Sequence, residues 1–156
     1  MEKRREMTKM LDYPDFLPAP EELSPLVLAY IGDAVYELYV RLLLVAHGPG
    51  KMKDLHQKAV SLVKAGAQAE ILREIEPMLS GEERDIVRWG RNAKTGHVPK
   101  GAQMVEYRYS TGFEALVGYL YLKGRHDRLL QLMRRLEKMM VERGTGDAEQ
   151  DAGEAD

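Results

Sequence analysis

One apolar segment, residues 26–45, constrains the fold of this chain more than any other feature. It reads Leu-Val-Leu-Ala-Tyr-Ile-Gly-Asp-Ala-Val-Tyr-Glu-Leu-Tyr-Val-Arg-Leu-Leu-Leu-Val, with Asp33 and Glu37 among aliphatic and aromatic residues. A carboxylate buried in such surroundings costs several kcal/mol if it stays charged and unpaired. A salt bridge, a hydrogen bond, a raised pKa or a metal ion must therefore offset the burial of Asp33.

The same segment is long enough to cross a lipid bilayer, but its charges argue against a membrane span. Asp33, Glu37 and Arg41 are spaced four residues apart, so they share one stripe of a helix near its middle. Each charge would cost a few kcal/mol at that depth. We therefore expect a buried helix of a soluble protein, in which Glu37 pairs with Arg41 and Asp33 is the less explained acid.

The composition is that of an ordinary globular protein with one domain. The chain has 156 residues, 44% hydrophobic and 31% charged. It contains no cysteine, which removes disulfides and Cys-based zinc sites and fits a reducing cytoplasm. No apolar run precedes residue 26, so we expect no secretory signal and a cytoplasmic location.

Helix caps and apolar periodicity predict an all-α fold, because no run shows sustained alternation. Ser24 is suited to be the N-cap of the first helix, and Asp54 and Ser80 begin capping-box patterns for the second and fourth. The expected helices cover roughly residues 24–47, 54–66, 67–76, 80–91, 105–123 and 127–143. Residues 1–22 read as an irregular leader, 23–144 as the folded domain and 145–156 as a disordered acidic tail.

Charge is distributed unevenly along the chain. The net charge is -2, yet the acids of the tail conceal a mildly basic body. Within that body, residues 84–108 carry an excess of bases and include a Gly-, Pro- and Lys-containing loop at 92–104. Long loops inside compact domains are usually functional. This segment is a candidate surface for a polyanion, with a solvated helix face as the alternative.

The acids that invite chemistry are Asp33 and Glu114, which lie in the two most apolar predicted helices. If these helices pack together, two close carboxylates need a proton or a cation between them. Hard oxygen ligands suit Mg²⁺, with Mn²⁺ as a substitute. The alternative is that each acid pairs with a nearby base such as Arg41, Arg108 or Lys123.

Other chemistries have little support in the sequence. The four histidines do not show a zinc-ligand spacing, and the P-loop and Gly-x-Ser-x-Gly patterns are absent. Trp89, next to Arg88, is suited to stack on a base, but a lone Trp in an amphipathic helix is more often a core residue. We therefore expect Trp89 in the core.

Four segments, taken in order, resemble the Mini-ribonuclease III family. They are Leu-Ala-Tyr-Ile-Gly-Asp-Ala-Val-Tyr-Glu at 28–37, Lys-Ala-Gly-Ala-Gln-Ala-Glu-Ile-Leu at 64–72, Gly-Arg-Asn-Ala-Lys-Thr-Gly at 90–96 and Tyr-Arg-Tyr-Ser-Thr-Gly-Phe-Glu-Ala-Leu-Val-Gly-Tyr-Leu at 107–120. This family is a short relative of ribonuclease III that keeps the helical endonuclease domain and lacks the double-stranded-RNA-binding domain. The resemblance covers about residues 23–125.

The resemblance implies a ribonuclease III endonuclease-domain helical bundle that works as a homodimer, with a catalytic valley across the subunits. Asp33 matches the aspartate of the family's Gly-Asp-Ala motif, and Glu114 matches the glutamate of its Phe-Glu-Ala-Leu motif. By this resemblance both residues are catalytic and hold Mg²⁺, and cleavage leaves a 5′-phosphate and a 3′-hydroxyl.

Compared with the larger ribonuclease III pattern, this chain has Ala29 and Thr111 where two further acids are expected. Members of the Mini-ribonuclease III family share this reduced set. The difference therefore argues for the subfamily, and fewer protein ligands mean more water around the ion.

The missing RNA-binding domain needs a substitute, for which the basic segment is our hypothesis. Double-stranded RNA is recognised mainly by shape, phosphates and 2′-hydroxyls, for which a Lys-, Arg- and Gly-containing loop is suited. The candidate RNA-binding residues are Arg88, Arg91, Asn92, Lys94, His97, Lys100 and Arg108.

The expected function is thus Mg²⁺-dependent cleavage of double-stranded RNA, and the resemblance implies maturation of the large-subunit (23S) ribosomal RNA precursor, with a ribosomal protein left open as a further partner. One alternative is a non-catalytic dimer that binds structured RNA in ribosome assembly. Another is a helical protein-interaction domain. RNA affinity and metal-dependent cleavage separate these three.

Overall fold

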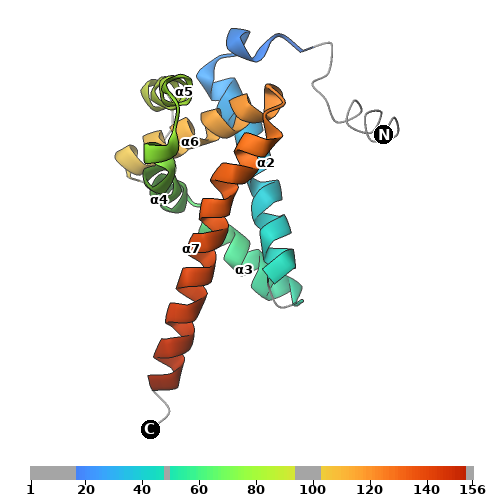
Figure 1. The fold of residues 1–156 in the computed structure, drawn as a ribbon, viewed down its shortest axis with the longest axis vertical. Coiled ribbons are helices and arrows are strands. Elements are labelled where there is room, and N and C mark those ends of the chain that lie inside the picture. Colours follow the sequence, from blue (N-terminus) through green and yellow to red (C-terminus); the bar gives the residue numbers. More distant parts are fainter. Residues whose placement is uncertain (1–16, 48–49, 94–102, 154–156) are drawn as a thin grey trace, which may run out of the picture.

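The computed structural model describes residues 17–47, 50–93 and 103–153, with side chains through Glu142. Within these ranges all regular structure is helical and there is no strand, which confirms the all-α prediction (Figure 1). The elements are η1 (Pro20–Glu22), α2 (Pro25–His47), α3 (Met52–Val63), α4 (Ala65–Ile75), η2 (Glu76–Met78), α5 (Gly81–Asn92), α6 (Met104–Leu122) and α7 (His126–Gly153).

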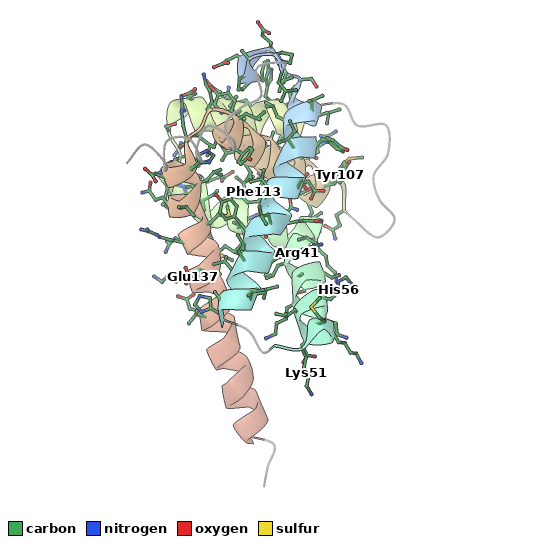
Figure 2. The ribbon with its side chains drawn as sticks, turned by 90° about the vertical axis from the view of Figure 1, so that its right-hand side faces the viewer. Arg41, Lys51, His56, Tyr107, Phe113 and Glu137 are labelled. Carbon is green, nitrogen blue, oxygen red and sulfur yellow. The ribbon has the colours of Figure 1, made fainter. Side chains whose placement is uncertain are left out.

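The central element is α6, against which α2, α4 and α5 all pack (Figure 1). Nearly every residue from Ser110 to Leu122 is buried, and α2 makes the most extensive contact with it. Phe113 points into the interior (Figure 2), where its ring meets the Tyr36 ring edge-on with centroids 5.2 Å apart. The core is therefore built around α6, and its apolar burial is a main source of stability.

Direct backbone contact is what allows α2 and α6 to approach so closely. A Cβ atom at Gly32 would overlap the carbonyl oxygen of Glu114, and one at Gly118 would overlap the carbonyl oxygen of Leu28. Only glycine leaves room at these two positions. The crossing therefore fixes the residues beside Gly32 and Glu114 relative to each other.

Salt bridges and hydrogen bonds tie the start of α7 to α5. Arg128 donates to both carboxylate oxygens of Glu83, at 2.9 and 2.8 Å, and to the carbonyl oxygen of Met78 at 2.6 Å. Glu83 also closes the predicted capping box with Ser80. The predicted N-cap of the first helix is present too, because Ser24 Oγ accepts from the amide of Val27 at 3.3 Å.

Three local predictions were wrong, and the first two concern α3 and α5. α3 begins at Met52, so Asp54 lies in the first turn, where its negative charge favours the helix N-terminus, and it is not a capping residue. Trp89 is 52% exposed on the outer side of α5, because the apolar face of α5 is supplied by Val87 and Gly90.

The prediction of a basic loop is not tested, because most of that loop, residues 94–102, lies outside the described residues.

The third error concerns α7, which continues to Gly153 rather than ending at Gly144. Its helical backbone thus covers residues 145–153 of the segment that we expected to be disordered. Gly144 and Gly146 each cost only about 1 kcal/mol in a helix relative to alanine, so a helix with good formers on both sides can pass through them. Within the described residues, no helix is both long and apolar enough to cross a membrane.

Candidate active site

The close crossing of α2 and α6 brings Asp33 and Glu114 together. Gly32 packs on the backbone carbonyl of Glu114, and Asp33 is the next residue along α2. Both acidic side chains are half-buried. Two residues that are 81 positions apart in the sequence are therefore neighbours because of a glycine contact between their helices.

The surroundings of these acids favour their neutral forms. Burial raises the pKa of Glu114 from its ordinary value of 4.5 to about 8, and the negative charges of Asp33 and Glu37 add to this shift. A hydrogen bond from Gln68 lowers the pKa of Glu114 and offsets part of the shift. Burial also raises the pKa of Asp33, as does the charge of Glu37. Each acid is therefore costly in its charged form unless a cation is nearby.

Bases do not supply that cation in the part of the chain that the structure describes. Arg41 lies 3.9 Å from Glu37, which confirms the predicted pair, and Lys123 pairs with Glu21 instead of Glu114. The described ion pairs include neither Asp33 nor Glu114. The pairing of these two acids with Arg41, Arg108 or Lys123, which the sequence left open, does not occur among the described residues.

Two neighbouring carboxylates without an ion-pair partner among the described residues are a donor set that fits a divalent cation such as Mg²⁺. Among the described residues, no third acid or histidine joins them to complete a metal-binding group. The hydroxyl of Thr111 donates to the carbonyl oxygen of Tyr107 at 3.0 Å, and Ala29 is a core residue without a side-chain oxygen. The protein would thus supply two ligands and leave the remaining positions to water.

Two residues around the acids were missed by the sequence analysis. Tyr36 is fully buried and its hydroxyl donates to the carbonyl oxygen of Leu62 at 2.7 Å. Gln68 is 1% exposed, and its Nε2 donates to the carbonyl oxygen of Val63 at 3.0 Å. These carbonyls belong to the last turn of α3, where helix carbonyls lack intrahelical partners. The only sequence signal was a Gln within an apolar helix face.

The predicted RNA-binding residues fall into two groups. Lys94, His97 and Lys100 lie outside the described residues. Arg88, Arg91 and Asn92 are on α5 and Arg108 is on α6. Arg88 and Arg91 line a cleft of about 440 Å³ together with Arg84, whose guanidinium donates to the carbonyl oxygens of Leu79 and Glu76.

Arg91 is also held by an aromatic side chain. Its guanidinium lies 4.7 Å from the centre of the Tyr109 ring, and Arg73 lies 5.6 Å from the same ring. Arg88 pairs with Asp85 at 3.0 Å on the surface, where such a pair contributes little. The structure thus brings several guanidinium groups to one region of α4, α5 and α6.

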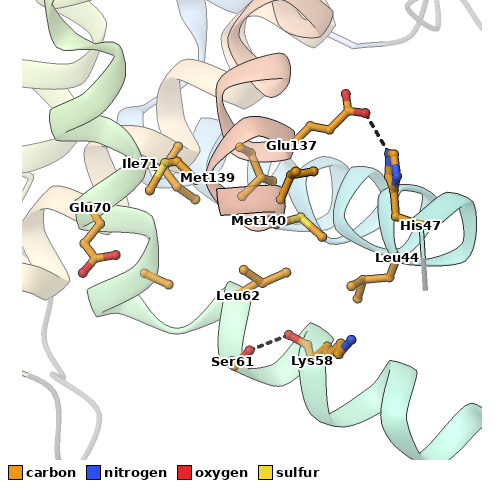
Figure 3. A pocket seen from close by; sticks show the side chains of 13 residues that line it. Leu44, His47, Lys58, Ser61, Leu62, Glu70, Ile71, Glu137, Met139 and Met140 are labelled. Carbon is orange, nitrogen blue, oxygen red and sulfur yellow. Dashed lines mark hydrogen bonds and ion pairs between the residues drawn. The ribbon is translucent and has the colours of Figure 1, made fainter. Parts of the chain in front are cut away.

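A separate cavity of about 430 Å³ lies between α2, α3, α4 and α7 (Figure 3). Leu62, Ile71 and Met140 form part of its apolar wall, and a His47–Glu137 pair at 2.7 Å lies at its rim. None of the predicted site residues lines it. Its lining thus combines apolar side chains with polar ones such as Lys58 and Ser61, and it is separate from the acid pair.

Known proteins share both the sequence pattern and the fold. The sequence model of the ribonuclease III domain family matches residues 26–125, which run from α2 to just past α6. A crystal structure of a Fusobacterium nucleatum protein is similar with a TM-score of 0.69 and 28% identity, covering 76% of this chain and 95% of that one. The fold is thus that of a ribonuclease III domain.

Curated relatives identify the branch of the family to which this chain belongs. Mini-ribonuclease 3 of Thermoanaerobacter sp. is 55% identical over 111 residues, which cover 71% of this chain and 78% of the relative. Mini-ribonuclease 3 of Symbiobacterium thermophilum is 49% identical over 128 residues, covering 82% and 98%. The chain belongs to the Mini-ribonuclease 3 branch of the ribonuclease III family. The resemblance in the sequence is confirmed, and the protein is an endoribonuclease.

The raised pKa of Glu114 predicts that the metal-free protein loses stability as the pH rises. The carboxyl group of Glu114 loses its proton near pH 4.5 in the unfolded chain and near pH 8 in the folded protein. The folded state therefore binds more protons between these values, and its stability decreases across that interval. Melting temperatures in EDTA should fall more steeply for the parent than for Glu114→Gln, which does not ionise. Parallel curves for the two proteins would contradict the assigned shift.

Proposed function

We propose that this endoribonuclease cleaves double-stranded RNA in a Mg²⁺-dependent reaction that leaves a 5′-phosphate and a 3′-hydroxyl. The observation that carries the proposal is the pair Asp33 and Glu114, two half-buried acids at one helix crossing without an ion-pair partner among the described residues. Membership of the ribonuclease III family supports the substrate class. Asp33 and Glu114 are the proposed catalytic and metal-binding residues.

In the proposed reaction the two carboxylates bind and orient the cation. Because the pKa of Glu114 is raised to about 8, its proton must leave when a cation binds. The bound ion supplies an activated water and stabilises negative charge on the scissile phosphate. The half-buried position of both acids limits competing water, which strengthens their attraction for a positive charge.

The proposed substrate is the precursor of large-subunit (23S) ribosomal RNA, and the proposed place of action is the cytoplasm. This part rests on the four sequence segments that resemble the Mini-ribonuclease III family. A ribosomal protein that helps to present this RNA belongs to the same proposal. The absence of cysteine agrees with a reducing compartment.

A metal-dependent cleavage assay tests the acid pair. We expect purified protein to cut a defined RNA duplex with Mg²⁺ and not with EDTA. Asp33→Asn and Glu114→Gln should lower the rate roughly 100-fold or more, because each removes a charge that would face the cation. Glu74→Gln, which neutralises an exposed acid on α4, is the matched control and should cut like the parent.

Two outcomes would redirect the proposal. Cutting by Asp33→Asn at the parent rate would defeat its assignment. Metal-independent binding of the duplex by the parent, without any cleavage, would favour the alternative of a non-catalytic RNA binder.

We propose that the basic residues on α5 and the following loop bind the RNA backbone. Arg88 and Arg91 line one cleft, and Lys94 and Lys100 belong to the segment that connects α5 to α6. Asn92, His97 and Arg108 complete the proposed surface. Guanidinium groups in a cleft are suited to phosphates because they donate in a planar fork.

RNA affinity measured across salt concentrations tests this surface. We expect Arg88→Gln with Arg91→Gln, and separately Lys94→Ala with Lys100→Ala, to weaken binding to the duplex. The slope of log affinity against log salt should become shallower by about 1 for each phosphate that the variant no longer neutralises. Lys138→Gln, an exposed base on α7, is the control. Unchanged affinity and slope in both double variants would remove the proposal.

We also propose that the protein is a homodimer joined through an exposed apolar stripe of α2. Tyr30 is 82% exposed and Val45 is 69% exposed. Together with Val27, Leu38 and Leu42 they are spaced three, four or eight residues apart, so they share one face of the helix. An exposed apolar stripe of this kind marks an interface, and a second copy of the chain is the partner that the family implies.

The oligomeric state tests this stripe. We expect the parent to sediment as a dimer and the Leu38→Glu, Leu42→Glu double variant to sediment as a folded monomer, because two charges would be buried at the contact. Leu130→Glu, on α7, replaces an equally apolar exposed residue and should leave the dimer intact. A dimeric double variant would place the interface elsewhere.

A further inference from the structure

Gln68 is a buried polar residue whose hydrogen bonds the fold leaves incomplete. Four polar side chains are buried in the described residues: Gln68, Glu83, Ser110 and Thr111. The hydroxyls of Ser110 and Thr111 donate to a carbonyl of their own helix, and Glu83 is bonded by Arg128 and Ser80. Gln68 differs, because its Oε1 has no partner in the structure.

An unsatisfied buried polar atom destabilises the folded protein, so an apolar residue of similar shape would suit the core better. Leu, Ile and Ala side chains occupy the neighbouring buried positions of α4, namely Ala69, Ile71 and Leu72. The fold therefore accounts for the amide nitrogen of Gln68, which bonds Val63, and leaves the amide oxygen without a partner.

The orientation of the Gln68 amide is defined by its neighbour in α3. The carbonyl oxygen of Val63 can only accept, so the atom that lies 3.0 Å from it must be the donor Nε2. This nitrogen carries two hydrogens, and one is used by Val63. The other is available to Glu114, because the Gln68 amide is close enough to the Glu114 carboxyl group to lower its pKa. The amide nitrogen therefore links the end of α3 to the acid on α6.

Tyr36 provides an internal comparison, because it is attached to the same end of α3. Its hydroxyl donates to the carbonyl oxygen of Leu62, one residue before the acceptor of Gln68. That single hydrogen is used there, so Tyr36 does not have a donor left for a carboxylate. Tyr36 and Gln68 thus share a structural role, and only Gln68 has a second donor.

We propose that Gln68 is a positioning residue, whose amide nitrogen is anchored by the carbonyl of Val63 and holds the Glu114 carboxylate in the orientation that binds a divalent cation. This inference rests on the proposed function, because it assumes that Glu114 is a metal ligand. An amide suits this role because it orients the carboxylate without a positive charge, which would compete with the cation. Outer residues of this kind commonly change metal affinity 10- to 100-fold.

Titration of the RNA-free protein with Mn²⁺, followed by electron paramagnetic resonance of the free ion, tests the inference without measuring activity. The variants are Gln68→Met, Tyr36→Phe and Glu114→Gln. Gln68→Met has a similar shape and no donor, so we expect roughly 10-fold weaker Mn²⁺ binding or more. Tyr36→Phe removes the comparable bond to α3 and should bind Mn²⁺ like the parent, although urea unfolding should show a similar loss of stability in both.

The outcomes separate the inference from the function on which it rests. Parent-like Mn²⁺ binding by Gln68→Met, with binding lost in Glu114→Gln, would overturn the role of Gln68 and leave the acid pair assigned. Equally weakened Mn²⁺ binding in Gln68→Met and Tyr36→Phe would mean that Gln68 acts only by holding the end of α3 in place. Parent-like binding by Glu114→Gln would instead defeat the proposed function. If Gln68→Met does not fold, Gln68→Asn must show the same loss of Mn²⁺ affinity, because its shorter amide does not reach both Val63 and Glu114.

Discussion

Direct backbone contact between α2 and α6 is the constraint on which the rest of this structure depends. Gly32 and Gly118 leave no space for a side chain, and a second glycine contact, between Gly90 and Gly112, also brings α5 close to α6. Interiors are packed as densely as crystals, so helices held in this way have little freedom to shift. The position of Glu114 relative to Asp33 is consequently set by the backbone, and side chains around the pair only adjust its orientation.

The same close approach creates the electrostatic cost of the site. A carboxylate on α6 at this crossing is withdrawn from water, which raises the pKa of Glu114 to about 8. Buried carboxylates are usually compensated by bases, as Glu83 is by Arg128. At the acid pair the protein provides a single amide, from Gln68, and no base among the described residues. Burial of these acids without a base lowers the stability of the folded protein, and a local loss of stability is typical of functional sites.

Short-range features were the part of this fold that the sequence could predict. Ser24 and the Ser80–Glu83 box are caps whose partners lie within three residues, so their bonds follow from local spacing. Trp89 was misplaced because periodicity does not show which face of α5 meets α6 through glycines. The role of Gln68 depends on a carbonyl at the end of α3 and an acid on α6, which come together only in the folded chain. The pairing of Asp33 with Glu114 was accessible from the two apolar helices and from the resemblance, whereas the absence of an ion-pair partner for either acid among the described residues was not.

One helix, α2, carries three distinct faces. Gly32 is on the face that meets α6, the exposed stripe with Tyr30 and Leu38 is on another, and Asp33 lies between them by helical spacing. In the proposed dimer, a second copy on that stripe would remove further water from the flank of Asp33. Desolvation raises the pKa of an acid, so association would make the charged, metal-free form of Asp33 less stable. Dimer formation and metal binding are therefore expected to be linked through α2, because the residues that serve them are one helical turn apart.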